Sequence, residues 1–391
     1  MRYYIIAGEA SGDLHGSNLM RGLYREDPGA VIRFWGGGLM DAVCRESQEE
    51  QPGLVRDYNE GAVIGFSQVL LNAGKFARRL KDCCDDILAW KPDAVILIDY
   101  PGFNFRVARF AHEHGLRVFY YIAPKVWASR ENRIRKLKAW VDKLFIVFPF
   151  EKEYFTRKGV PYVYKGNPLI DAIDSSESMK QPRSDFFASC GLEDRPYVAV
   201  LAGSRSGEVS YMMPKIARFA DLMHSRKEFS SWQFIIAGAP SRRESDYSRW
   251  LEGRESYMHL VFGKTYAVLR HAEAAVINSG TASLEAALIG TPQVVCYGGS
   301  TFNFNIARLI LKVRFISLGN LILGRTCFRE LLQYYFTPEE TLNEVERLVS
   351  DAPYRAGMLE GYRQIREALG GSGASYAVAK AMIEEIKNTN Q

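Results

Sequence analysis

Apolar runs alternate with helical patterns in two successive series along this chain. In the first series the apolar runs cover residues 3–7, 31–35, 94–98, 117–122 and 144–148. The helical patterns between them cover residues 14–25, 70–90, 105–114 and 130–139. Continuous apolar runs are typical of parallel strands that are covered on both faces, and repeated strand–helix alternation predicts a doubly wound α/β domain.

A polar segment interrupts the pattern at residues 174–196, which read as a linker with a short helix. A second series of apolar runs covers residues 197–201, 233–237, 259–261, 275–277 and 293–296. We therefore predict Rossmann-like domains at residues 1–173 and 197–350, followed by helices at 351–391 that pack back on the first domain. Such domains face each other across a cleft, and ligands of open α/β sheets bind at the carboxyl ends of the strands.

The composition narrows the class of protein. The chain has 391 residues, of which 47% are hydrophobic and 24% charged, and this fits a folded protein of two domains. No apolar run approaches the roughly 18 residues of a membrane span, and the N-terminus enters a strand without the layout of a signal peptide, so we expect a cytoplasmic protein. The six cysteines include no CxxC pair, which gives no indication of a zinc site or a disulfide framework.

The basic residues are clustered, although the net charge is only +5. Seven lysines and arginines lie between Lys125 and Lys143, against only Glu131 and Asp142. A second basic cluster lies within residues 75–81. Such clusters attract phosphate groups; the alternative is a solvated helix face.

Two loops of the second half are suited to a diphosphate. The first, in "AGSRSGEVS", follows the run at 197–201 and includes Gly203, Ser204, Arg205 and Glu208, close to a predicted helix start. Small residues let backbone amides approach an anion, a helix N-terminus favours it, and an arginine binds phosphate with two hydrogen bonds. The alternative is an ordinary turn with a surface arginine.

The second loop, in "INSGTASLEAALIGTP", follows the run at 275–277. We expect Ser279, Gly280 and Thr281 at a helix start, with amides and hydroxyls directed to the same diphosphate. Glu285 is predicted on the first helical turn, where a carboxylate accepts hydrogen bonds from a ribose or only complements the helix dipole. The sequence contains no GxGxxG after the first strand of either half and no GxxxxGK[ST], which argues against a dinucleotide cofactor and a P-loop ATPase.

The loops of the first half carry the candidate chemistry. In "LIDYPGFNFR", Asp99 ends the most apolar run, and Asn104 is placed to cap the next helix and is a candidate for the sugar and acceptor cleft. A carboxylate at a strand end is well placed as a general base; alternatively, Asp99 satisfies nearby backbone amides. The later stretch "YYIAPKVWASR", with Trp127, is aromatic and basic and suits a sugar and a phosphate.

The opening stretch "IIAGEASGDLHG" supplies further candidates for the cleft. They are Gly8, Glu9, Ser11, Gly12 and Asp13. The amides of Ser11 and Gly12 are expected to point towards the cleft. Asp13 is also placed to cap a helix that begins near Leu14.

Eight motifs occur in the order in which the lipid-A-disaccharide synthases have them. They are AGEASGD, DYPGFN, YIAPKVWA, FPFE, GNPLID, GSRSGE, SGTASLEAAL and SLGNLILGR. The resemblance runs from about residue 3 to about residue 345, which is nearly the whole chain. It implies the GT-B architecture of two Rossmann-like domains, with the acceptor and the membrane on the side of residues 1–173 and the UDP-sugar on the side of residues 197–350.

The resemblance also implies the reaction. UDP-2,3-diacylglucosamine is joined to 2,3-diacylglucosamine 1-phosphate, giving a β(1→6)-linked disaccharide 1-phosphate and UDP, with inversion and without a metal or other cofactor. Asp99 would be the general base for the acceptor's 6-hydroxyl. The loops at Gly203 and Ser279, together with Asn320 and Arg325, would hold UDP. The expected location is the cytoplasmic face of the inner membrane, and the family has been seen as homodimers with exchanged C-terminal parts; no nucleic acid is expected.

Both substrates carry acyl chains, so an apolar surface is expected near the acceptor. Apolar and basic residues recur at helical spacing in one stretch, in the pattern of an interfacial helix. They are Phe66, Val69, Leu70, Lys75, Phe76, Arg78 and Arg79. The sequence alone favours a core-facing amphipathic helix, whereas the resemblance favours membrane contact. Residues 302–315 fit a core segment, a lipid-facing segment or a subunit contact.

Two other functions remain open from the sequence. A UDP-sugar 2-epimerase of the same architecture needs neither an acceptor nor an acyl-chain surface. A non-catalytic UDP-sugar or lipid-binding protein would keep the Arg205 loop but would have no use for Asp99.

Overall fold

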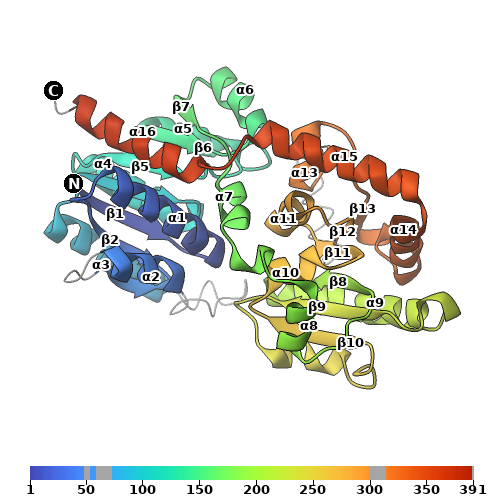
Figure 1. The fold of residues 1–391 in the computed structure, drawn as a ribbon. Coiled ribbons are helices and arrows are strands. Elements are labelled where there is room, and N and C mark those ends of the chain that lie inside the picture. The colour runs from blue at the N-terminus through green and yellow to red at the C-terminus, as the bar shows by residue number, and fades with distance from the viewer. Residues whose placement is uncertain (48–52, 59–72, 300–313, 390–391) are drawn as a thin grey trace. The chain divides into compact units, whose positions relative to one another are not determined.

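A computed structural model describes residues 1–47, 53–58, 73–299 and 314–389. The chain divides into two compact units (Figure 1). The first unit combines Met1–Ala172 with Gly371–Gln391, and the second is Ile173–Gly370. Each unit contains one parallel sheet covered by helices, so the predicted fold class of two Rossmann-like α/β domains is confirmed.

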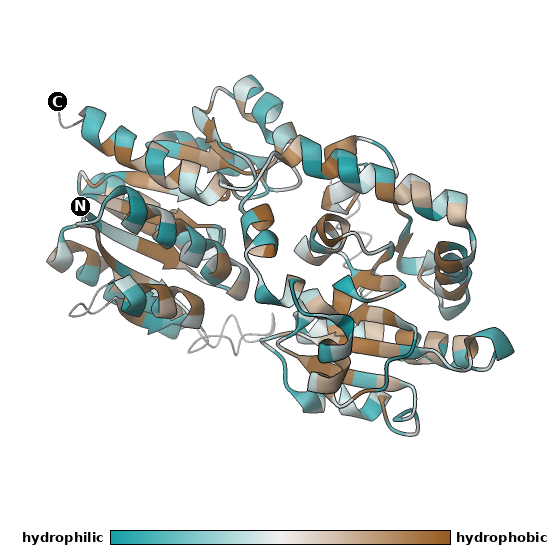
Figure 2. Ribbon diagram, in the orientation of Figure 1, coloured by the Kyte–Doolittle hydropathy of each residue, from teal (hydrophilic) through white to brown (hydrophobic). Residues whose placement is uncertain are grey.

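The first unit has a parallel sheet of seven strands in the order β3-β2-β1-β4-β5-β6-β7. The strands are β1 (Arg2–Ala7), β2 (Val31–Gly36), β3 (Leu54–Asp57), β4 (Ala94–Ile98), β5 (Val118–Tyr121), β6 (Lys143–Ile146) and β7 (Tyr162–Tyr164). All five residues of β4 are buried, which explains its wholly apolar sequence. Figure 2 shows the central strands of both sheets as the most hydrophobic part of each unit.

Helices connect these strands and cover the sheet of the first unit. They are α1 (Ala10–Glu26), α2 (Gly38–Ser47), α3 (Ala73–Trp90), α4 (Pro101–Glu113), α5 (Ile134–Trp140), α6 (Pro149–Arg157), α7 (Pro168–Asp174) and α16 (Ala374–Thr389). A short 3-10 turn, η3 (Glu131–Arg133), precedes α5. The last helix, α16, runs beside α1 (Figure 1).

The second unit has a parallel sheet of six strands in the order β10-β9-β8-β11-β12-β13. The strands are β8 (Tyr197–Leu201), β9 (Gln233–Gly238), β10 (Met258–Phe262), β11 (Ala274–Asn278), β12 (Gln293–Tyr297) and β13 (Glu330–Leu332). Its main helices are α8 (Arg183–Cys190), α9 (Ser206–His224), α10 (Thr265–Arg270), α11 (Thr281–Ile289), α13 (Leu318–Leu323), α14 (Pro338–Ser350) and α15 (Ala352–Leu369).

The strand orders locate the functional edge of each sheet. In a doubly wound sheet the ligand crevice lies at the carboxyl ends of the strands where the strand order reverses. That point lies between β1 and β4 in the first unit and between β8 and β11 in the second. The opening loop and the Asp99 loop follow β1 and β4, and the loops at Gly203 and Ser279 follow β8 and β11.

The unit boundaries differ from the predicted domains in two places. Residues 174–196 are more than a linker, because α8 buries Phe186 and Phe187 in the core of the second unit. The C-terminal helices do not all return to the first unit, since α15 belongs to the second unit and only α16 belongs to the first. Within the described residues, no helix is both long enough and apolar enough to cross a membrane.

Candidate active site

Asp99 lies in a strained connection between β4 and α4. Its φ is 42° and that of Tyr100 is 44°, both in the left-handed region that residues other than glycine rarely adopt. The backbone is fixed there because the carbonyl of Asp99 accepts hydrogen bonds from the Tyr120 hydroxyl at 2.6 Å and from the Asn104 side-chain amide at 2.8 Å. These contacts hold the half-buried Asp99 side chain at the carboxyl end of the sheet.

The predicted capping role of Asn104 is wrong. Helix α4 begins at Pro101, three residues earlier, with Tyr100 at its N-cap. Asn104 is buried inside the helix and donates hydrogen bonds back to the carbonyls of Ile98 and Asp99. It therefore anchors the backbone of the Asp99 loop.

Burial raises the pKa of the Asp99 carboxyl above its ordinary value. The nearby positive charges of Lys125 and Arg133 lower this pKa, and the negative charge of Glu9 raises it. A raised pKa strengthens a carboxylate as a proton acceptor, which suits a general base.

Backbone strain is concentrated around this loop. Among the described residues, six non-glycine residues have a positive φ, and four of them are Asp99, Tyr100, Ile122 and Arg130. These four lie in the loops after β4 and β5, which are neighbouring strands with Ile98 paired to Tyr121. Strain of this kind costs about 1–3 kcal/mol per residue and is concentrated at functional sites. It marks this edge of the sheet independently of any motif.

The opening loop lies beside Asp99. A Cβ at Gly8 would stand 2.3 Å from the ring of Tyr100, so only glycine lets the two loops approach this closely. Glu9 is the exposed N-cap residue of α1 without a capping side-chain hydrogen bond, and Ser11 and Gly12 lie in the first turn. The amides of this turn point out of the N-terminus of α1, as helix geometry requires.

Asp13 has a different role from the one predicted. Helix α1 begins at Ala10, so Asp13 is inside it and cannot cap it. Its buried carboxylate accepts hydrogen bonds from the backbone amides of Gly37, Leu39 and Met40 at 2.9–3.1 Å. Asp13 thus caps the start of α2, and its part in the acceptor cleft stays a prediction.

Trp127 is held by the carboxylate of Glu151, which was not among the predicted site residues. Its indole N–H donates to Glu151 Oε1 at 3.0 Å, and its ring packs edge-on against Phe150. The other oxygen of Glu151 accepts from the amides of Val147 and Phe148. Burial raises the pKa of Glu151 to about 7. The FPFE motif contains Glu151, but nothing in the sequence indicates that Trp127 is the partner of this glutamate.

The Gly203 loop of the second unit is built around Glu208. Glu208 accepts hydrogen bonds from the amides of Ser204 and Arg205 and from the Arg205 guanidinium, at 3.0–3.2 Å. A Cβ at Gly203, whose φ is 102°, would come within 2.6 Å of this carboxylate. Glu208 occupies donors that were predicted for phosphate, so it organises the loop. Arg205 is 74% exposed at the N-cap of α9 and remains accessible.

The loop after β11 begins a helix as predicted, at Thr281 with Gly280 as N-cap. Ser279 is fixed within the unit, since its amide donates to the carbonyl of Cys296 and its hydroxyl to that of Ile316. Glu285 is the fifth residue of α11, so it lies beyond the first turn where it was predicted. It accepts a hydrogen bond from the Tyr266 hydroxyl at 3.3 Å, and burial raises its pKa to about 7.

Asn320 and Arg325 differ in their surroundings. Asn320 is fully buried; its amide donates to Phe328 and Glu330, and its oxygen accepts from the amides of Cys327 and Phe328. These hydrogen bonds satisfy the side chain of Asn320 inside the unit, and its contact with UDP stays a prediction. Arg325 is exposed and donates to Gln364 at 2.7 Å.

The predicted membrane-facing stretch is only partly described. Phe66, Val69 and Leu70 lie outside the described residues. Phe76 does not face outwards as predicted: it packs edge-on against Phe103 in the core of the first unit, with the guanidinium of Arg106 above its ring. The described part of α3 therefore follows the core-facing alternative.

The basic residues of this stretch lie on α3 and differ in their contacts. Lys75 and Arg78 are exposed. Arg79 lies over the ring of Trp35.

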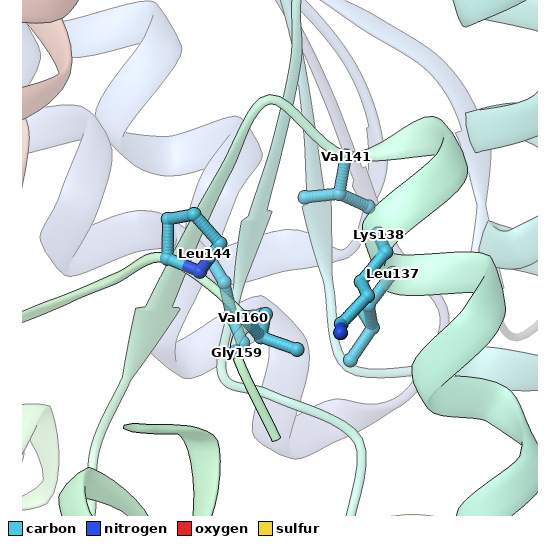
Figure 3. Close-up of a pocket in the computed structure, with 7 residues that line it drawn as sticks. Leu137, Lys138, Val141, Leu144, Gly159 and Val160 are labelled. Atoms are coloured by element: carbon cyan, nitrogen blue, oxygen red, sulfur yellow. The ribbon is translucent and has the colours of Figure 1, made fainter. Parts of the chain in front are cut away.

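A cavity of about 250 Å³ lies at the opposite end of the first sheet (Figure 3). Leu137, Lys138 and Val141 line it from α5 and the residue after it, and Leu144 and residues 159–161 line it from the amino-terminal ends of β6 and β7. Because the site loops follow carboxyl ends, this cavity is not part of the candidate active site.

Comparison with known proteins identifies the family to which this chain belongs. Residues 3–375 match the family described as lipid-A-disaccharide synthetase. The chain belongs to the lipid-A-disaccharide synthetase family. A relative named lipid-A-disaccharide synthase from Trichlorobacter lovleyi is 35% identical over 99% of this chain and 98% of its own length. A relative of the same name from Myxococcus xanthus is 34% identical over 98% of this chain and 97% of its own length.

Solved structures show the fold that this family member shares with other enzymes. The UDP-GlcNAc 2-epimerase of Neisseria meningitidis, solved with UDP-GlcNAc, has a TM-score of 0.64 at 15% identity, over 98% of this chain and 100% of its own. A putative UDP-N-acetylglucosamine 2-epimerase of Listeria monocytogenes has a TM-score of 0.67 at 14% identity, over 99% of this chain and 97% of its own. At this identity the likeness concerns the architecture alone.

Proposed function

We propose that this chain is a lipid-A-disaccharide synthase in which the first unit supplies the general base and the second unit binds UDP. The enzyme is a glycosyltransferase that joins UDP-2,3-diacylglucosamine to 2,3-diacylglucosamine 1-phosphate and releases UDP. The family match over residues 3–375 favours this activity over a UDP-sugar 2-epimerase, because the epimerase likeness is limited to the fold.

The observation that carries the mechanism is the anchored, strained Asp99 at the carboxyl end of β4. In the proposed reaction the acceptor's 6-hydroxyl attacks the anomeric carbon of the donor from the face opposite UDP. Asp99 takes the hydroxyl proton as the new C–O bond forms and the bond to UDP breaks. Positioned general-base catalysis accelerates such a step by about 10²–10⁴-fold.

In this scheme the departing UDP acquires negative charge on its β-phosphate. Arg205, the amides in the first turn of α9, and Thr281 at the start of α11 are the proposed donors to this charge. Glu285 is the proposed partner of the ribose hydroxyls, with Tyr266 supporting its carboxylate.

A substitution of Asp99 tests the proposed function. We expect Asp99→Asn to reduce UDP release from the two lipid substrates by at least ~10²-fold, because the amide cannot accept the proton. UDP affinity should be unchanged, since Asp99 belongs to the other unit. Asp93→Asn, at the other end of β4, is the control. Near-normal turnover of Asp99→Asn would exclude Asp99 as the base.

A substitution of Arg205 tests the UDP site. Removing a charge-assisted contact with phosphate should weaken UDP binding by roughly tenfold or more. The change is Arg205→Ala, compared with Arg243→Ala, an exposed arginine in the same unit. Isothermal titration calorimetry with UDP measures the affinity, and an unchanged value would remove Arg205 from the site.

The membrane and oligomer predictions belong to the same proposal. Both substrates are lipids, so we place the enzyme at the cytoplasmic face of the inner membrane, with the exposed Lys75 and Arg78 near the lipid headgroups. A homodimer with exchanged C-terminal parts is compatible with α16, which is last in the chain but belongs to the first unit.

A further inference from the structure

Three basic side chains follow β5 without an ion-pair partner in the described part of the chain: Lys125, Arg130 and Arg133. The acid between them, Glu131, forms an ion pair with Lys158 at 2.5 Å. Lys125 and Arg130 are exposed and Arg133 is half-buried. This edge of the sheet therefore carries three basic side chains that form no ion pair among the described residues.

The backbones of the two arginines are joined by a hydrogen bond. Arg130 is the N-cap residue of the 3-10 turn η3 and Arg133 is its last residue, and the Arg133 amide donates to the Arg130 carbonyl at 3.0 Å. Arg130 holds this position at a strained φ of 57°, and the guanidinium of Arg133 lies 5.8 Å from the ring centre of Phe105.

The same charges adjoin Asp99. Lys125 and Arg133 are both close enough to lower its pKa, and Arg130 is close enough to lower the pKa of Arg133. Two guanidinium groups held together repel each other unless an anion lies between them, and the planar fork of arginine is suited to phosphate oxygens.

We infer that Arg130 and Arg133, with Lys125, form a binding site for the phosphate monoester of the acceptor sugar, beside the base that activates its hydroxyl. This inference rests on the proposed function, in which a single sugar carries both the attacking hydroxyl and the phosphate. Binding the phosphate here fixes the sugar at both ends and holds its hydroxyl against Asp99. Lys125, whose charge acts on the Asp99 carboxylate, adds a third positive charge to this site.

The test compares the KM values for the two substrates in neutral detergent micelles. Arg130→Gln and Arg133→Gln should each raise the KM for 2,3-diacylglucosamine 1-phosphate by roughly tenfold or more, while the KM for the UDP-sugar stays within about twofold. Arg133→Lys keeps the charge but loses the fork, so its KM should lie between the wild-type and Arg133→Gln values. Arg135→Gln, an equal loss of charge at an exposed position on α5, is the control.

Further outcomes separate this inference from its alternatives. An unchanged acceptor KM, or an equal rise in both KM values, would overturn it. So would variants that lose binding to phosphatidylglycerol vesicles while the acceptor KM in neutral micelles is unchanged, since the arginines would then bind lipid headgroups. If the wild-type enzyme releases no UDP from the two lipid substrates, the proposed function itself fails. Thermal melts of each variant identify loss of folding.

Discussion

Asp99 illustrates how a residue's role depends on neighbours that are distant in sequence. Its carbonyl is held by Tyr120, and its charge is balanced between Glu9, Lys125 and Arg133. Tyr120 belongs to β5, Lys125 and Arg133 follow β5, and Glu9 follows β1, so only the parallel sheet brings these groups to one edge. The proton affinity of the proposed base is thus a property of the whole edge.

The charges around Asp99 predict opposite shifts in pH dependence. Glu9→Gln removes a charge that raises the pKa of Asp99, so the acidic limb of the kcat/KM profile should move to lower pH. Lys125→Gln removes a charge that lowers this pKa, so the limb should move to higher pH. Rates of UDP release across pH measure both, with Glu46→Gln at the far end of α2 as control. Shifts of the same sign in both variants would contradict the assignment of Asp99.

At the scale of elements, close packing between α1 and α16 joins the two ends of the chain. Gly22 of α1 is buried, and a Cβ there would lie 2.9 Å from the Cβ of Ala379 and 3.2 Å from the Cα of Tyr376. Contacts below 3.0 Å force the helices apart. The carboxylate of Asp171 also accepts hydrogen bonds from the amides of Gly373 and Ser375 at the start of α16.

The Gly22 contact predicts an unusual response to alanine. Gly22→Ala should lower the free energy of unfolding by about 1–3 kcal/mol through overpacking, although alanine is favoured in a helix interior by roughly 1 kcal/mol. The loss should be smaller when Ala379→Gly is also present, because the closest contact is then removed. Urea denaturation of the single and double variants measures this coupling. Additive effects would show that the helices do not meet at these two residues.

At the scale of the whole molecule, the first unit is completed by the last residues of the chain. Helix α16 buries apolar side chains against this unit, among them Val378, Met382, Ile383 and Ile386. Each fully buried aliphatic side chain contributes about 1.5–3 kcal/mol, and a domain is stable by only about 5–15 kcal/mol in total. The first unit should therefore depend on α16.

Removal of residues 371–391 should destabilise the first unit selectively. We expect limited proteolysis with peptide mapping to cut the truncated chain preferentially within residues 1–172, while residues 173–370 stay protected. A chain that ends at Lys387 retains nearly all of α16 and serves as control. Equal protection of residues 1–172 in both chains would show that α16 is not required.

The apolar runs alone predicted ten of the strands and the loops that follow them, because buried parallel strands have a local signature. The strands β3, β7 and β13 were missed; they have three or four residues each, too few for a clear pattern. The candidate site was found in part for the same reason: Asp99, Arg205 and Thr281 directly follow strands that could be recognised.

The sequence by itself determined where the strands end and which side chains follow them. The tertiary structure decided what individual side chains contact. Asp13 caps a helix other than its own, Phe76 packs against Phe103, and Glu208 accepts hydrogen bonds from the amides of the Gly203 loop. It also decided that α16 belongs to the first unit. The physical reason is range: apolar periodicity is a property of neighbouring residues, whereas a hydrogen bond or a packed surface needs a partner that only folding brings within reach.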